Sequence, residues 1–325
     1  MIKSVDFPTL IKAVKVCVDE EIEAICDEFD VDERVRPLLV RGKRLRSAVL
    51  CLPLAHGQMT GTDFDEYHLT PQAYTLAAAI EIAHAASLIM DDVIDEDPTR
   101  RGQPTLHTKI GRDKALMNSV GLLAIPYEIA SMNGPYFVKS LGETQRSMVK
   151  GIVTEMFKHP DLPAMALYDA IVTRKTGTLF SLAATWGYHA YCLAGGKAVN
   201  VITRERWREY GRLLGIVMQV ADDIADLRDA DAGKKPLGTG SESVLLRALS
   251  LDTLAKELVR DLKTRDFHLE KIHLTYSDEG ILHGLITRLQ RDISRAEEEA
   301  AYIYPVDCLL VDTPTEIAAM MLEEE

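Results

Sequence analysis

The chain has 325 residues, of which 47% are hydrophobic and 27% are charged, so it can bury the core of one large domain or of two ordinary ones. Its formal net charge of -13 argues against a protein that binds duplex nucleic acid, because such proteins usually carry a strong basic excess. We therefore expect a globular protein with no nucleic-acid partner.

Helix-like periodicity dominates the chain, with apolar residues at three- and four-residue steps. The predicted helices lie near residues 8–29, 43–55, 70–96, 112–132, 138–158, 165–192, 204–228, 241–263 and 279–303. Thr70 and Pro71 mark one start, because a threonine hydroxyl caps a helix and proline suits its first turn. No linker or repeat is visible, and strand-like alternation is almost absent. We expect an all-α protein, a single large helical bundle with a central cavity, in which residues 1–325 form one domain.

The cysteine pattern and the apolar segments indicate a cytoplasmic protein. The five cysteines form no Cys-x-x-Cys pair, so reduced thiols are expected rather than zinc ligands. The N-terminal residues contain no signal-peptide core. The most apolar segments contain Glu81, His84 or Pro126, which we expect to interrupt them before they reach membrane-spanning length, so no transmembrane segment is predicted.

One acidic pattern occurs twice, as DDVID at Asp91–Asp95 and as DDIAD at Asp222–Asp226. In a helix, residues four apart share a face, so each copy would present two carboxylates in one direction. Solvated surface charge is the ordinary explanation of one such cluster. Both copies, however, follow apolar stretches that should be buried, and buried carboxylates need partners. The two motifs together therefore indicate a binding site.

The ligand chemistry of these motifs favours magnesium. Oxygen ligands without Cys or His select hard cations, which here means Mg²⁺ before zinc or copper. Magnesium prefers few protein ligands and completes its shell with water and phosphate oxygens. We therefore expect a phosphate or diphosphate as the third component, with both motifs facing one cavity.

Several basic and polar side chains could bind the remaining phosphate oxygens. They are Lys43 and Arg46 in RGKRLR, Arg100 and Arg101 after the first acidic motif, and Lys175 with Thr176 in an apolar helix. Lys43 and Arg46 would lie one turn apart in a helix. Each of these segments, taken alone, would ordinarily be a solvated part of the surface. His84, seven residues before Asp91, and Gln219, three residues before Asp222, would add a polar group on the face of each acidic motif.

In this order, the segments resemble those of the all-trans polyprenyl (isoprenyl) diphosphate synthases, a family that includes farnesyl and geranylgeranyl diphosphate synthases. The resemblance covers nearly the whole chain. It rests on GKRLR, AHAASLIMDDVIDEDPTRRGQPTLH, RKTGTLF and LLGIVMQVADDIADL. It implies a homodimeric trans-prenyltransferase that condenses an allylic diphosphate with isopentenyl diphosphate by Mg²⁺-dependent ionisation, condensation and elimination.

The resemblance also implies roles for individual residues. Three Mg²⁺ ions would be bound by Asp91, Asp95 and Asp222, with support from Asp92 and Asp226. The allylic diphosphate would be held by Arg100, Lys175 and Gln219, and Thr176 would help to place the reacting groups. The diphosphate of isopentenyl diphosphate would be held by Lys43, Arg46, His84 and Arg101. Either Lys234 or Lys235 would close the site.

Product length should depend on the helical face below Asp91. The residues four, five, eight and twelve positions before it are all small: Ser87, Ala86, Ala83 and Ala79. Farnesyl synthases of the resembled family usually have an aromatic plug four or five positions back, so a product of twenty carbons or more is predicted. A plug could come instead from a neighbouring helix, with Met117, Tyr127 or Phe137 as candidates.

The chain departs from the resembled family in a few places. Ser47 stands where proline is frequent, Ser119-Val120 where Gly-Asp is frequent, and Met218 where an aromatic residue is usual. The loop after Asp226 is about two residues shorter than usual, which leaves open whether Lys234 or Lys235 acts.

Two other functions fit part of the pattern. A class I terpene cyclase would share the fold, the magnesium and the allylic diphosphate, but it would not need a second diphosphate site. A non-catalytic regulatory subunit of a prenyl synthase usually lacks one aspartate motif, whereas both motifs are present here. A metal-dependent phosphohydrolase would want His-Asp ligand pairs, and none occurs. The sequence therefore favours the synthase.

Overall fold

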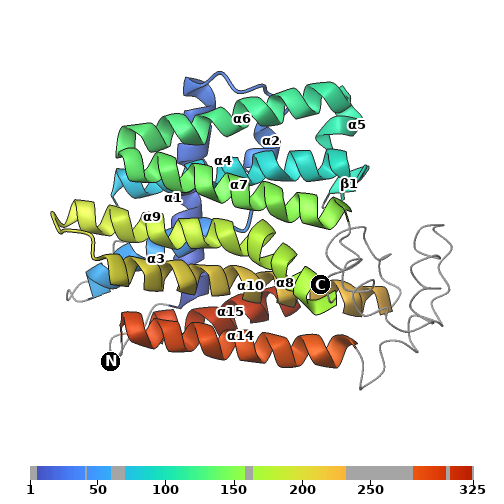
Figure 1. Cartoon of the computed structure of the whole chain (residues 1–325). Helices are drawn as coiled ribbons and strands as arrows, with labels where there is room; N and C mark the ends of the chain where they lie inside the picture. Colours follow the sequence, from blue (N-terminus) through green and yellow to red (C-terminus); the bar gives the residue numbers. More distant parts are fainter. Residues whose placement is uncertain are drawn as a thin grey trace. The chain divides into compact units, whose positions relative to one another are not determined.

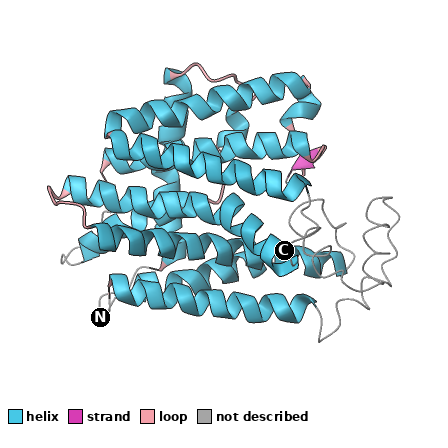
Figure 2. Cartoon of the chain, viewed as in Figure 1, coloured by secondary structure: helices cyan, strands magenta, loops and turns pink. Residues whose placement is uncertain are grey.

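The computed structural model describes residues 6–40, 42–59, 70–100, 102–157, 164–231, 281–304 and 308–323. These residues are almost entirely helical, as Figures 1 and 2 show, so the all-α prediction is confirmed. Arg101, Lys234, Lys235 and the helix predicted near 241–263 lie outside the described residues.

The chain forms two compact units. The first contains residues 1–144, 179–211 and 307–309, and the second contains residues 145–178, 212–306 and 310–325. The organisation of residues 1–325 as one domain stays a prediction.

Of the elements that the structure describes, the first unit contains most of the helices and a short pair of strands. Its elements are α1 (Phe7–Glu28), α2 (Arg36–Leu39), α3 (Leu45–Met59), α4 (Pro71–Ile94), β1 (Thr99–Arg100), β2 (Gln103–Pro104), α5 (Leu106–Ile110), α6 (Arg112–Asn133) and parts of α7 (Pro135–Phe157), α9 (Thr178–Ala194) and α10 (Val201–Asp231). Its cysteines Cys17, Cys26, Cys51 and Cys192 are free thiols, as expected.

Helix α4 is the central helix of this unit and packs against α1, α3 and α6. It starts where the sequence predicts, because the Thr70 hydroxyl accepts a hydrogen bond from the Ala73 N–H at 3.3 Å and Pro71 occupies the first turn. Its buried residues occur on nearly all sides, which is the pattern of a helix enclosed by neighbours. A polar side chain on α4 therefore needs a partner.

The second unit holds the remaining segments. They are the rest of α7 and α10, with α8 (Ala164–Val172), η1 (Thr173–Gly177), α14 (Ile281–Ile303) and most of α15 (Cys308–Leu322). The single helix predicted over residues 165–192 is thus interrupted at Thr173–Gly177 by a π-helical turn. Such turns are rare and occur often at functional sites.

In the part of the chain that the structure describes, two helices, α4 and α6, are long and apolar enough to cross a membrane by length and composition alone. The expectation that Glu81, His84 and Pro126 shorten these segments is wrong, because both helices run through these positions. The most apolar window of α4 is 67% buried inside the structure, as is usual for a core helix, so this test is weak evidence for a membrane span.

The backbones of α3 and α9 approach each other closely at Gly187. A Cβ atom at this position would lie 1.9 Å from the carbonyl oxygen of Leu50. Because the obstacle is backbone, a rotamer change cannot relieve the contact.

We expect Gly187→Ala to lower the free energy of unfolding by about 1–3 kcal/mol or more, since the two helices must move apart. Urea denaturation provides the measurement. Gly284→Ala in α14 is the matched control, because a Cβ there would meet nothing within 4 Å and alanine should stabilise the helix by about 0.5–1 kcal/mol. Equal stability of both variants would contradict the close contact.

Candidate functional site

The first acidic motif lies at the C-terminal end of α4. Asp91 and Asp92 are 9% and 5% exposed, and Asp95 is the half-buried C-cap residue, whose N–H donates to the Asp91 carbonyl at 2.8 Å. Three carboxylates thus lie at the negative end of the helix dipole, and the last turn contains no basic residue. Both the dipole and the repulsion between like charges favour binding of a cation here.

Arg100 lies beside this motif. Its Nε donates to Asp92 Oδ1 at 2.5 Å, from strand β1. Burial raises the pKa of Asp92, and the Arg100 guanidinium opposes that shift. The pair lines a pocket of about 110 Å³ together with Leu38, Leu88 and Ile89. This volume is too small for a prenyl chain, since ligand pockets usually measure about 300–1,000 Å³.

The basic segment, residues 42–46, precedes and enters α3. The helix begins at Leu45, and Arg44 has a φ of 59°, so Lys43 is not helical and the predicted one-turn relation between Lys43 and Arg46 is wrong. Both cationic side chains are half-buried. The Arg46 guanidinium lies 4.8 Å from the ring centre of Phe180, in the range of a cation–π contact.

The small residues below Asp91 face the interior of the first unit. Ala79, Ala83 and Ala86 are at most 5% exposed, and Ser87 is half-buried. The Ser119 hydroxyl of α6 donates to the Ala86 carbonyl at 2.7 Å, so α6 packs closely against α4 at this level. His84 is half-buried on the same helix.

The side chains proposed as plugs differ in burial. Met117 is 66% exposed, so it is the least enclosed of the three candidates, and its role as a plug stays a prediction. Phe137 is 1% exposed and contacts Trp186 edge-on, with ring centres 5.3 Å apart. Tyr127 is half-buried.

In the second unit, the Lys-Thr motif lies within the π-helical turn η1. The Lys175 ammonium is paired with Glu155 of α7, with 3.0 Å between Nζ and Oε2. Thr176 is buried and donates to Gln219 Oε1 of α10 at 2.8 Å. Two adjacent side chains of this turn therefore bond to different helices, Lys175 to α7 and Thr176 to α10.

A hydrogen-bonded relay continues from Thr176 through Gln219 to a buried carboxylate. The Gln219 Nε2 donates to Asp223 Oδ1 at 2.9 Å, and the Tyr168 hydroxyl donates to Asp223 Oδ2 at 2.5 Å. Burial and the nearby Asp223 charge raise the pKa of Tyr168 well above its usual value, so the phenol remains a donor. The Arg288 guanidinium lies 4.9 Å from the ring centre of Tyr168.

Asp223 is a functional candidate that sequence reasoning missed, together with Tyr168 and Glu155. It is 1% exposed, whereas Asp222 and Asp226 on the same helix are half-buried. Adjacent residues on a helix point about 100° apart, so one carboxylate of a consecutive pair turns inward and needs buried donors. This rule could have predicted an inward Asp223, but nothing in the sequence identifies Tyr168 or Glu155 as the partners.

The two acidic motifs belong to different compact units, so their meeting around one ligand is a proposal. Among the described residues, no group of three or more His, Cys, Asp or Glu side chains is arranged to hold a metal ion. The donors still fit Mg²⁺, because this ion usually binds one or two carboxylates together with water and substrate phosphates.

Solved structures share this fold. A polyprenyl synthase from Caulobacter crescentus, complexed with calcium and isoprenyl diphosphate, has a TM-score of 0.74, with 24% identity and coverage of 100% of this chain and 99% of that chain. A decaprenyl diphosphate synthase from Rhodobacter capsulatus has a TM-score of 0.73, with 21% identity and coverage of 97% and 99%. At these identities the likeness shows the fold.

Sequence comparison identifies the family. The chain matches the model of the polyprenyl synthetase family over residues 31–264. It is 28% identical to a geranylgeranyl diphosphate synthase of Pseudescherichia vulneris, over 80% of this chain and 85% of that protein. It is 31% identical to geranylgeranyl pyrophosphate synthase 11 of Arabidopsis thaliana, over 70% of this chain and 64%, just under two thirds, of that protein. The chain belongs to the polyprenyl synthetase family, whose members are trans-prenyltransferases that use divalent metal ions.

We expect Tyr168→Phe to lower the free energy of unfolding by about 1–3 kcal/mol, because a buried carboxylate loses a donor while the ring beneath Arg288 is kept. Urea denaturation measures this loss. Tyr191→Phe is the control, since the Tyr191 hydroxyl bonds only at the surface with Lys197 and its loss should cost less than about 0.5 kcal/mol. A loss no larger for Tyr168→Phe than for the control would contradict a buried relay.

Proposed function

We propose that this protein condenses an allylic diphosphate with isopentenyl diphosphate to give a product of twenty carbons or more. Membership of the polyprenyl synthetase family supports the reaction type. The observation that carries the proposal is the end of α4, where three carboxylates at the negative end of a buried helix favour a cation. The basic segment of the same unit supplies the charge that a second diphosphate needs.

The proposed reaction separates charge and then restores an alkene. The allylic carbon–oxygen bond breaks, and its electron pair leaves with the diphosphate. The double bond of isopentenyl diphosphate forms the new carbon–carbon bond to the allylic carbon. A proton then passes to the released diphosphate, and the product is five carbons longer. Apolar walls exclude water, which would otherwise capture the cation.

The metal requirement follows from the carboxylates. Asp91, Asp95 and Asp222 would bind three Mg²⁺ ions, with Asp92 and Asp226 in support. When bound, the ions supply positive charge that stabilises the leaving diphosphate. This arrangement requires both motifs to face one cavity.

The remaining polar side chains would hold the two substrates. Arg100, Lys175 and Gln219 would bind the allylic diphosphate, and the relay from Tyr168 through Asp223 would fix the orientation of Gln219 and Thr176. Isopentenyl diphosphate would be held by Lys43, Arg46, His84 and Arg101. Lys234 or Lys235 would close the site.

Product length would be set by the small residues below Asp91, since no aromatic side chain stands four or five positions before it. Relatives that are named as geranylgeranyl diphosphate synthases support a lower limit of twenty carbons. Ser87 is the position most open to change, because it is half-buried and its hydroxyl bonds only to the His84 carbonyl of its own helix.

We also propose that the protein is a cytoplasmic homodimer with no transmembrane segment. An exposed stripe on α6 supports a dimer, because Met117 and Val120 are 66% and 55% exposed and Gly121 and Ala124 lie on the same face. The burial of α4 supports the absence of a membrane span.

The reaction is tested by incubating the purified chain with Mg²⁺, isopentenyl diphosphate and a dimethylallyl, geranyl or farnesyl primer, followed by chromatography. We expect products of twenty carbons or more, and a fall in kcat of at least about 100-fold for Asp91→Asn and for Asp222→Asn, because each loses metal-based stabilisation of the transition state. Asp30→Asn is the isosteric control, at an exposed residue with a φ of 49° that asparagine tolerates, and should leave kcat unchanged.

Other outcomes of this assay point to other functions. Turnover of geranylgeranyl diphosphate without isopentenyl diphosphate would indicate a terpene cyclase. No incorporation from any primer would indicate a non-catalytic subunit.

Product length is tested with Ser87→Phe. We expect shorter products than those of the wild type, because a ring four positions before Asp91 narrows the space below the carboxylates. Ser131→Phe, at an exposed position of α6, is the control for adding a ring and should leave product length unchanged. Unchanged length in Ser87→Phe would place the tunnel along another face.

A further inference from the structure

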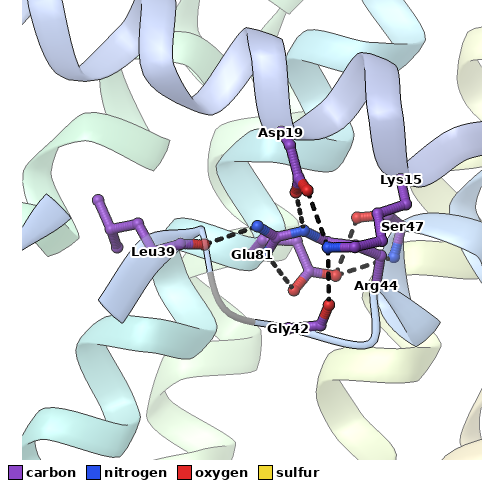
Figure 3. Close-up of polar contacts among 7 residues, drawn as sticks. All are labelled: Lys15, Asp19, Leu39, Gly42, Arg44, Ser47 and Glu81. Atoms are coloured by element: carbon purple, nitrogen blue, oxygen red, sulfur yellow. Dashed lines mark hydrogen bonds and ion pairs between the residues drawn. The ribbon is translucent and has the colours of Figure 1, made fainter. Parts of the chain in front are cut away.

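Arg44 is buried in the middle of the basic segment, between two half-buried cations. Its side chain is 2% exposed and is bonded to three different segments of the first unit (Figure 3). Nε donates to Asp19 Oδ1 of α1 at 2.6 Å, and Nη2 donates to the Leu39 carbonyl of α2 at 2.7 Å. Nη1 donates to Glu81 Oε2 of α4 at 3.4 Å. This arginine faces the protein interior and is not available to a ligand.

Glu81 connects the same network to the first turn of α3. Its Oε1 accepts hydrogen bonds from the Ser47 N–H at 3.1 Å and from the Ser47 hydroxyl at 2.9 Å (Figure 3). The carboxylate therefore caps the N-terminal end of α3, where the helix dipole favours a negative charge. Ser47, which stands where the resembled family often has proline, supplies the N–H that proline lacks.

Lys15 completes the network and holds the start of the basic segment. Its Nζ donates to the Gly42 carbonyl at 3.3 Å and to Asp19 Oδ2 at 2.8 Å. Two cations, Lys15 and Arg44, are thus matched by two anions, Asp19 and Glu81. Arg44 and Glu81 are buried in this group, whereas Lys15 and Asp19 lie at its edge with 41% and 29% of their side chains exposed. Charge balance and hydrogen bonding are what allow the two inner ionised side chains to be buried.

The network fixes the backbone on both sides of each half-buried cation, Lys43 and Arg46. Gly42 and Arg44 are held on either side of Lys43, and Arg44 and Ser47 are held on either side of Arg46. Glu81 lies three residues before His84 on α4, so the same carboxylate links the segment to the helix that carries the third proposed ligand. The distances among Lys43, Arg46 and His84 therefore depend on this one hydrogen-bonded network.

The backbone of Arg44 supports this interpretation. Its φ of 59° lies in the left-handed region, which is unfavourable for a residue other than glycine. A buried ion pair contributes little stability compared with an apolar replacement, so the cluster is poorly explained by stability alone. The cluster is better explained by the backbone conformation that it holds in the basic segment.

We propose that Arg44 is a positioning residue, which acts through Glu81, Asp19 and the Leu39 carbonyl to hold Lys43 and Arg46 at the spacing that binds the diphosphate group of isopentenyl diphosphate. The inference rests on the proposed function. Arg44 itself does not touch the substrate. Loss of the cluster displaces the cations that do, which weakens binding of the diphosphate of isopentenyl diphosphate without touching the metal-binding carboxylates.

Two conservative variants test the proposal. Arg44→Lys keeps the charge but cannot bond to three segments, and Glu81→Gln keeps an acceptor for Ser47 but removes the charge. For both variants we expect the KM for isopentenyl diphosphate to rise about 10-fold or more. The KM for the allylic primer and kcat should change less than about 3-fold, because the metal-binding carboxylates are untouched. Calorimetric titration with isopentenyl diphosphate alone should show the same loss of affinity.

Thr75→Val is the matched control. The Thr75 hydroxyl donates to Glu21 Oε1 at 2.6 Å, which is another polar contact between α4 and α1 but one remote from the basic segment. We expect it to lower the Tm without changing either KM. If Arg44→Lys and Glu81→Gln only lower the Tm, or if they lower kcat with both KM values unchanged, the positioning role is overturned.

Failure of the proposed function would be seen separately, as a wild-type chain that incorporates no isopentenyl diphosphate from any primer. In that event, titration of wild type and Arg44→Lys with inorganic pyrophosphate still tests the positioning role. About 10-fold weaker binding by the variant would support it, and equal binding would overturn it.

Discussion

The burial of α4 is the constraint on which the rest of the first unit depends. A helix enclosed by α1, α3 and α6 cannot carry an unpaired polar group without a large desolvation cost. Its polar side chains accordingly have specific partners: Glu81 bonds to Arg44 and Ser47, and Asp92 bonds to Arg100. The carboxylates at its C-terminal end occupy the least favourable electrostatic position of the helix, and a cation bound there would offset that cost. Charge is thus concentrated where a metal–diphosphate ligand would bind.

In the second unit, too, buried polar side chains have specific partners. Consecutive aspartates on α10 point in different directions, so Asp223 turns inward to Tyr168 and Gln219 while Asp222 remains half-buried. In the π-helical turn at Thr173–Gly177, the adjacent residues Lys175 and Thr176 likewise bond to different helices. In both places a buried polar group orients a neighbouring side chain that is proposed to meet the substrate.

The sequence predicts the long helices better than it predicts the contacts at the site. The long helices follow from apolar periodicity, and the α4 start follows from Thr70 and Pro71, because both signals are local. The π-helical turn, the short helices α2 and α5 and the hairpin at Thr99–Pro104 carry no comparable periodic signal. The inward direction of Arg44 was also invisible, since it depends on acceptors from α1, α2 and α4 that are distant in the sequence. Local pattern thus identified the charged residues, whereas tertiary contacts decide which of them face a ligand.

We propose that Asp91 and Asp222 bind metal ions on one diphosphate. This proposal is tested most directly by a crystal structure of the chain with Mg²⁺ and inorganic pyrophosphate. We expect carboxylate oxygens of both residues about 2.0–2.1 Å from metal ions that share a single pyrophosphate. Metal ions bound at only one motif, or two motifs that bind separate pyrophosphate molecules, would contradict it.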